Sequence, residues 1–124
     1  QRQMCIRDRY LVYPQGNYIR PADSKPYLVI GEVKYGKPIL DRVITPKVSI
    51  GDASRCALIS MDSTLKSDLT VGPPIDFAVI KKDEIKIASL KCLNMNDPEF
   101  SKVCNQWSQG IFKIFDSFQR FDWE

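Results

Sequence analysis

Gly36 and Pro38 constrain the fold most, because they stand two positions apart directly before an apolar run in "KYGKPILDRV". Glycine permits a sharp turn, and proline suits the first turn of a helix, where its missing N–H costs nothing. Four apolar residues then fall on one helical side, namely Ile39, Leu40, Val43 and Ile44. The Thr45-Pro46 pair ends the helix, because a residue before proline disfavours helical backbone angles. We therefore expect a short helix that follows a glycine turn and lies across a sheet.

The longest regular pattern in the middle of the chain begins at Ser49. Asp52 follows three residues later, as in a capping box. Apolar residues recur at spacings of three or four, at Ile50, Ala53, Ala57, Met61 and Leu65. This periodicity predicts a helix that ends between residues 66 and 68.

The remaining segments predict strands and a final helix. Apolar runs predict strands at residues 10–13, 18–19, 27–30, 75–80 and 85–93, with turns at 14–17 and 81–84. Asp97 and Pro98 open a helix as its cap and first residue. That helix carries an apolar stripe of Phe100, Val103, Cys104, Trp107, Ile111, Ile114 and Phe115. Strand pairs that alternate with helices predict an α+β layered fold with antiparallel sheets.

The first nine residues, "QRQMCIRDR", stand apart from this pattern. The codons CAG CGT CAG ATG TGT ATA AGA GAC AG encode the run and resemble a transposase-end sequencing adapter. We expect residues 1–9 to be a translated scar, and residues 10–124 to be a piece that starts within a longer protein. The alternative is a native, flexible, basic N-terminus.

Composition argues against several classes of function once residues 1–9 are set aside. The 124 residues carry 18 basic and 15 acidic side chains, and residues 10–124 keep 15 and 14 of them. This near balance removes the case for a nucleic-acid surface. Residues 10–124 retain three widely spaced cysteines, Cys56, Cys92 and Cys104, and the chain has no histidine. We expect reduced thiols in a cytoplasm, no metal, no cofactor and no membrane segment.

Several stretches then carry a resemblance to a known family. "YPQGN", "IGEVKYGKPILDRVI", "ALISMDSTLKS", "VGPPID" and the terminal "DPEF…W" resemble the C-terminal half of Anbu proteins. These are bacterial proteasome-type peptidases within the proteasome β-subunit and N-terminal-nucleophile hydrolase superfamily. The resemblance implies the C-terminal half of a four-layer αββα sandwich.

The resemblance also implies an activity and its location. Family members hydrolyse peptide bonds with an N-terminal threonine, whose α-amino group serves as general base. A lysine and an acidic residue of the N-terminal half complete that centre, so the nucleophile is absent from this segment. The supporting groups implied here lie at the end of the second helix, namely Ser67, Thr64, Ser63, Asp62 and Asp68. Ser67 and Thr64 align nearest to those roles. The serine that many β-subunits carry before the first helix has no match, because Gly31 and Glu32 occupy that region.

Other residues keep two interpretations open. Lys34 and Lys37 attract acidic peptide termini, or they are solvated or pair with a neighbouring subunit. Trp107 and the stripe at Phe100 line an interface or, the reading we favour, pack in the core. Cys56 and Cys104 are expected to be apolar fillers within helices.

Three functions follow. The first is a subunit fragment of a self-assembling ring or helical-ring peptidase that acts on peptides or unfolded chains. The second is a non-catalytic scaffold or binding subunit of the same fold. The third is an independent small binding domain, against which the half-sandwich topology argues.

Overall fold

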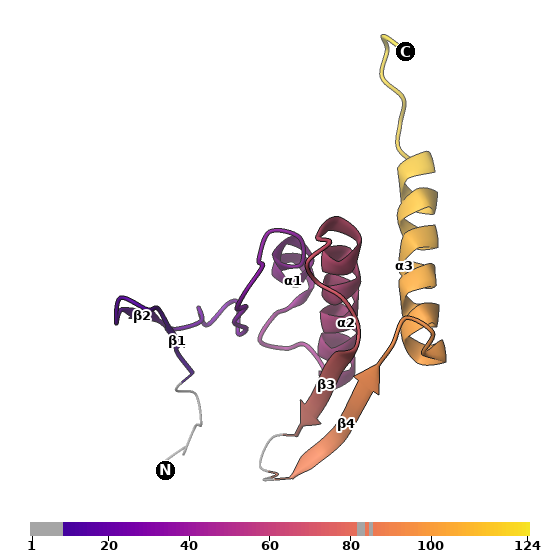
Figure 1. Ribbon diagram of the computed structural model, residues 1–124. Helices are drawn as coiled ribbons and strands as arrows, with labels where there is room; N and C mark the ends of the chain where they lie inside the picture. Colours follow the sequence, from indigo (N-terminus) through magenta and orange to yellow (C-terminus); the bar gives the residue numbers. More distant parts are fainter. Residues whose placement is uncertain (1–8, 82–83, 85) are drawn as a thin grey trace.

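The computed structural model describes residues 9–81, 84 and 86–124. Nearly all of the expected scar and part of the turn at 81–84 lie outside the described residues. Three helices and two antiparallel hairpins follow one another in the order β1, β2, α1, α2, β3, β4, α3 (Figure 1). The expected α+β class is therefore confirmed.

The first hairpin joins β1 (Leu11–Val12) to β2 (Tyr18–Ile19), with Leu11 opposite Ile19. Its turn is closed where the Tyr13 N–H donates to the Asn17 carbonyl at 2.8 Å. Gly16 has a φ of 88°, a left-handed conformation that glycine adopts without strain. The predicted strand, turn and returning strand are confirmed. The hairpin extends away from the helices (Figure 1).

The expectation of a strand at residues 27–30 is wrong. This segment is irregular, and it pairs with neither hairpin. The Tyr27 N–H donates to the Lys25 carbonyl at 2.9 Å, and Ile30 is 79% exposed. A run of apolar residues forms a strand only where a neighbouring strand offers its backbone groups, and none of the described strands lies beside this one.

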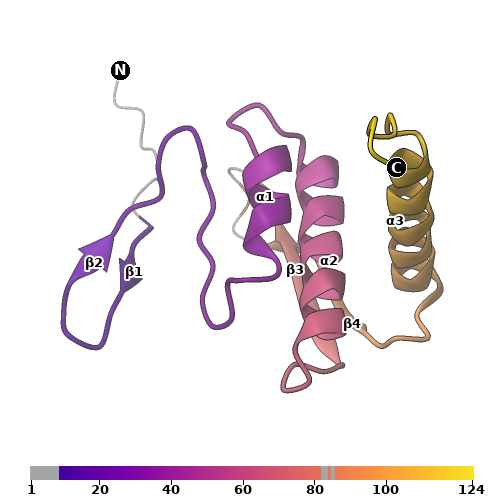
Figure 2. The same cartoon turned by 90° about the horizontal axis from the view of Figure 1, so that it is seen from above.

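Helix α1 (Lys37–Val43) starts where the glycine and proline predict, with Pro38 in its first turn. We predicted that position 36 requires glycine because glycine permits a sharp turn. That reason is wrong, because the φ of Gly36 is −89°, which is open to any residue. A Cβ at Gly36 would instead lie inside van der Waals contact of Ser60 Oγ, and 3.3 Å from Thr64 Oγ1. Glycine is required here for close packing of α1 on α2 (Ile50–Ser67). The two helices lie side by side (Figure 2).

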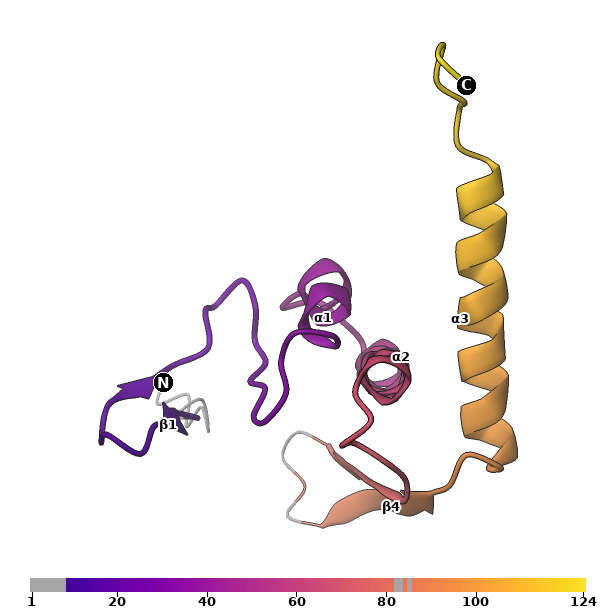
Figure 3. The same cartoon turned by 45° about the horizontal axis from the view of Figure 1, so that its top comes forward.

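The cap of α2 forms as predicted, since the Asp52 N–H donates to Ser49 Oγ at 3.0 Å. One side of α2 covers the hairpin of β3 (Ile75–Ile80) and β4 (Ile87–Leu93) (Figure 3). These strands pair antiparallel, with Ile75 opposite Leu93. Their inner residues and α3 (Pro98–Asp116) form the core, which contains Ile75, Leu93, Phe100 and Cys104 and is flanked by Leu58, Met61, Leu65 and Phe77.

The apolar stripe of α3 divides into two halves. Asp97 caps the helix, accepting at 3.1 Å from the N–H groups of Glu99 and Phe100. Phe100 is 1% exposed, so the core interpretation of the first half is confirmed. In the second half, Ile114 and Phe115 are 60% and 69% exposed. No helix among the described residues has the length and apolar character to cross a membrane.

We expect the substitution Gly36→Ala to lower the free energy of unfolding by about 1–3 kcal/mol, because the added methyl overpacks the contact between α1 and α2. Gly110→Ala is the matched control, since a Cβ there meets nothing within 4 Å and alanine favours a helix by about 1 kcal/mol. Urea denaturation followed by circular dichroism measures both. A Gly36→Ala chain as stable as the parent would show that this close approach is not required.

Candidate functional site

Four hydroxyl side chains gather on one side of the last two turns of α2. They are Ser60, Ser63, Thr64 and Ser67, which we call the hydroxyl face. Positions separated by three, four and seven residues share one side of an α-helix, so the spacing alone aligns them. The C-terminal end of α2 therefore presents a row of groups that donate and accept hydrogen bonds.

The middle of the hydroxyl face packs under the start of α1. Thr64 is 7% exposed, and its Oγ1 donates to the Ser60 carbonyl at 3.0 Å. Gly36 lies directly above both side chains. One turn earlier, Cys56 Sγ lies 3.9 Å from the Ile39 carbonyl oxygen, and burial raises the pKa of this thiol. Thr64 is thus held by α1, with its proton directed to the helix backbone.

The end of the face is open. Ser67, the last residue of α2, is exposed, and Asp68 forms the C-cap. Thr70 donates to Asp68 Oδ1 through Oγ1 at 2.6 Å and through its N–H at 2.9 Å. These bonds, with a smaller contribution from the charge of Lys34, hold the pKa of the Asp68 carboxyl below its usual value. Asp68 is therefore an anionic acceptor at neutral pH, directly beside Ser67.

Asp62 lies on the opposite side of α2. Residues two positions apart in an α-helix are separated by about 200° around the helix axis, so Asp62 cannot share a side with Ser60 and Thr64. It is 2% exposed and accepts from Lys66 Nζ at 3.0 Å. Lys66 Nζ also donates to Ser108 Oγ of α3 at 3.0 Å. A buried carboxylate with a paired cation therefore links α2 to α3.

Cys104 of α3 belongs to this buried group. The pKa of its thiol is raised to about 11, first by burial and then by a hydrogen bond to Asp62 and the charge of that carboxylate. The thiolate is disfavoured at neutral pH, which excludes Cys104 as a nucleophile here. Cys56 and Cys104 are both buried in helices, so their interpretation as apolar fillers is confirmed.

A second polar group fixes the segment before Gly36. Asp41 of α1 accepts from Lys37 Nζ at 2.7 Å, and also from Tyr27 Oη. The backbone carbonyl of Asp41 accepts from Lys25 Nζ. The Lys37 hydrogen bond, followed by that of Tyr27, holds the pKa of the Asp41 carboxyl below its usual value. Lys37 thus pairs within its own chain.

The structure brings three of the five predicted site residues together. Ser63, Thr64 and Ser67 share the hydroxyl face, and Asp68 follows at its end. Asp62 lies on the other side of the helix, against α3. Ser60 was not among the predicted site residues, although its hydroxyl four residues before Thr64 was the available signal. In the described ranges, no three His, Cys, Asp or Glu side chains are grouped to hold a metal ion.

Matches to this chain come from solved structures. No family model matches the chain, and no curated protein matches it significantly. Solved structures do match, among them Anbu from Hyphomicrobium sp. strain MC1 at 40% identity and a TM-score of 0.85, over 91% of this chain and 49% of that one.

Two further structures match over similar ranges. Anbu (ancestral beta-subunit) from Yersinia bercovieri has 39% identity and a TM-score of 0.86, over 91% of this chain and 48% of its own. The helical assembly of the Anbu complex from Pseudomonas aeruginosa has 40% identity and a TM-score of 0.84, over 90% and 46%. The chain thus spans about half the length of these relatives, and over nine-tenths of its residues it belongs to the Anbu family.

Proposed function

We propose that residues 10–124 are the C-terminal part of a single-domain, proteasome-type peptidase subunit, and that residues 1–9 are not native. The remaining half of the domain supplies the N-terminal nucleophile and completes a four-layer sandwich. The observation that carries the proposal is the hydroxyl face at the end of α2, in a chain 40% identical to Anbu over 91% of its length.

The reaction is hydrolysis of a peptide bond by an N-terminal threonine. The threonine hydroxyl attacks the carbonyl carbon while its proton passes to the threonine's own α-amino group. That amine has an ordinary pKa of about 8, so it works as a base near neutrality. The proton then passes to the leaving amine, and water hydrolyses the resulting ester.

Residues of this chain hold the amine in place. Ser67 and Asp68 form the open end of α2, where a hydroxyl and an ionised carboxylate accept hydrogen bonds from an ammonium group. Thr64 lies one turn deeper under Gly36 and fixes the distance between α1 and this end. Ser63 flanks them on the same face. Asp62 contributes through packing, because its carboxylate is enclosed against α3.

A non-catalytic scaffold is the second candidate. It is favoured by the relative from Pseudomonas aeruginosa, which forms a helical assembly. The residue exposed at the mature N-terminus of the remaining half separates the two functions: threonine, serine or cysteine there supports the peptidase. Both functions place the protein in the cytoplasm as a self-associating subunit whose substrates or partners are peptides or unfolded chains.

We expect the chain alone to cleave no fluorogenic peptide, and activity to appear when it is joined to the N-terminal half of an Anbu protein. In the joined protein, Ser67→Ala lowers kcat at least about tenfold, because a group that orients the base is lost. Ser54→Ala is the matched control, since its Oγ donates to the Ile50 carbonyl at the far end of the same helix. Cleavage by the isolated chain, or equal effects of the two substitutions, would contradict the proposal.

We expect Asp62→Asn to speed alkylation of Cys104 by iodoacetamide at least about threefold between pH 8 and pH 10. Removing the carboxylate charge lowers the raised pKa of the Cys104 thiol, so more thiolate is present. Mass spectrometry of the modified peptides gives the rate. Cys56 is the internal control, because burial alone raises its pKa. A parallel increase at Cys56 indicates unfolding, and an unchanged Cys104 rate would place Asp62 outside this buried group.

A further inference from the structure

A single lysine ties the end of α2 to α3. Lys66 Nζ donates to Asp62 Oδ2 on its own helix and to Ser108 Oγ on α3, each at 3.0 Å. The Asp62 side chain is 3% exposed, whereas that of Lys66 is 55% exposed. An enclosed carboxylate, a cation at its edge and a hydroxyl of the neighbouring helix thus form one chain of bonds, which we call the polar bridge.

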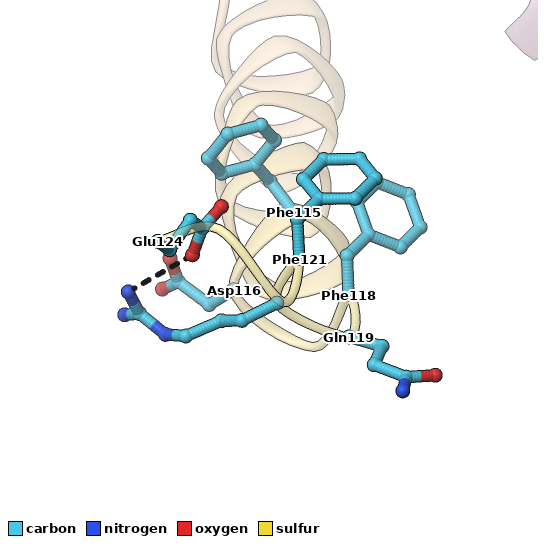
Figure 4. A pocket seen from close by; sticks show the side chains of 7 residues that line it. Phe115, Asp116, Phe118, Gln119, Phe121 and Glu124 are labelled. Carbon is cyan, nitrogen blue, oxygen red and sulfur yellow. Dashed lines mark hydrogen bonds and ion pairs between the residues drawn. The ribbon is translucent and has the colours of Figure 1, made fainter.

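The polar bridge lies where the packed part of α3 gives way to its exposed part. Cys104 is buried, but beyond Ser108 the large side chains are exposed. Figure 4 shows three of them around an open hollow of about 620 Å³: Phe115, Phe118 and Phe121. On α2, Leu65 is the last apolar residue that packs on the core. Beyond Leu65, the described contacts from α2 to α3 are therefore the polar ones of Lys66.

The direction of Ser67 depends on the helices on both sides of α2. Successive residues turn by about 100° around a helix axis, so Ser67 lies about 60° from Thr64 on one side and about 100° from Lys66 on the other. Thr64 is held under Gly36 by α1, and Lys66 is held by α3. Helix ends fray, because the last carbonyl groups have no partner within the helix. The two lateral ties therefore fix the turn from which Ser67 projects.

Stability alone does not explain an ion pair at this position. Withdrawing a carboxylate from water carries a large free-energy cost, which the attraction to its partner often does no more than offset. Apolar residues of similar volume give a fold as much stability, or more. Hydrogen bonds, unlike apolar contacts, restrict both the distance and the angle between their groups. What Asp62 and Lys66 add to an apolar contact is thus a defined rotation of the last turn of α2.

We propose that Lys66 is a positioning residue, which together with Asp62 and Ser108 holds Ser67 in the direction where it meets the amine of the nucleophile. The inference rests on the proposed function, because that amine belongs to the remaining half of the domain. Lys66 acts through Ser67, since its own ammonium is bonded on the side of α3. Loss of the polar bridge therefore slows the chemical step and leaves peptide binding unchanged.

Replacing both charges with apolar groups tests this role in the chain joined to the N-terminal half of an Anbu protein. For Asp62→Leu with Lys66→Met, we expect a melting temperature equal to or above that of the parent. We expect kcat at least about tenfold lower and KM within about twofold of the parent, because the misplaced group acts in the transition state. Lys66→Arg keeps a cation within reach of both oxygens and retains kcat within about threefold.

A second ion pair provides the matched control. Lys91 and Glu99 join β4 to α3, as Lys66 and Asp62 join α2 to α3, but away from the end of α2. Lys91→Met with Glu99→Gln is expected to leave kcat and KM unchanged. A structural role of the polar bridge alone would give a different pattern, in which the melting temperature falls and kcat is retained.

Amide hydrogen exchange of the full chain tests the polar bridge without reference to catalysis. The Asp68 N–H donates to the Thr64 carbonyl at 2.8 Å and closes the last turn of α2. In the apolar double variant, we expect this amide to exchange at least about tenfold faster, while the amides of residues 55–60 keep the parental rate. Ser108→Ala removes only the bond to α3, and we expect exchange at Asp68 at least about threefold faster. NMR measures each rate.

The outcomes distinguish this inference from the proposed function. Parental kcat in the apolar double variant, or parental exchange at Asp68, would overturn the positioning role and leave the peptidase proposal intact. So would a loss of kcat that the control pair shares or that accompanies a lower melting temperature. An inactive joined parent protein would overturn the peptidase proposal, and exchange at Asp68 would still decide whether the polar bridge holds the end of α2.

Discussion

The close approach of Gly36 to α2 determines where the first half of the molecule lies. Without a Cβ, the backbone at Gly36 lies against Ser60 and Thr64, and α1 follows α2 for its whole length. Asp41 then holds the preceding segment against α1, because Tyr27 and Lys25 donate hydrogen bonds to this residue. A single methyl at position 36 therefore acts on the hydroxyl face and on the irregular segment together.

Helix α2 has different neighbours on its two sides. Its hydroxyl side packs under α1, whereas the side with Met61, Asp62 and Leu65 packs on the core and on α3. Lys66 keeps the enclosed Asp62 carboxylate paired, which offsets part of the cost of burying a charge. The rotation of α2 about its axis is consequently fixed from both sides, and this rotation sets the direction of Ser67.

The sequence predicted most of the elements because their signals are local. Ser49 and Asp97 cap helices through side-chain bonds within three residues, and the hairpin turn at Gly16 is equally short-range. The strand expected at 27–30 failed because a strand depends on a neighbour distant in sequence. The steric role of Gly36 depends on Ser60, 24 positions away, so composition and turn preference could not reveal it. Helical spacing already separates Asp62 from Thr64, but only the packing shows that α3 encloses it.

The outer side of the second hairpin gives the protein a chemical handle. Cys92 is exposed opposite Asp76, whereas Cys56 and Cys104 are buried. Inner and outer residues alternate along each strand, so Cys92 shares its side with Leu90, which is 68% exposed and lies away from the core. In a chain that starts at residue 10 and so lacks Cys5, a fluorophore attached to this sulfur would sense the polarity of whatever sheet or solvent meets the hairpin, while the two helical thiols stay unlabelled. The fold thus contains its own reporter for assembly with a complementary half.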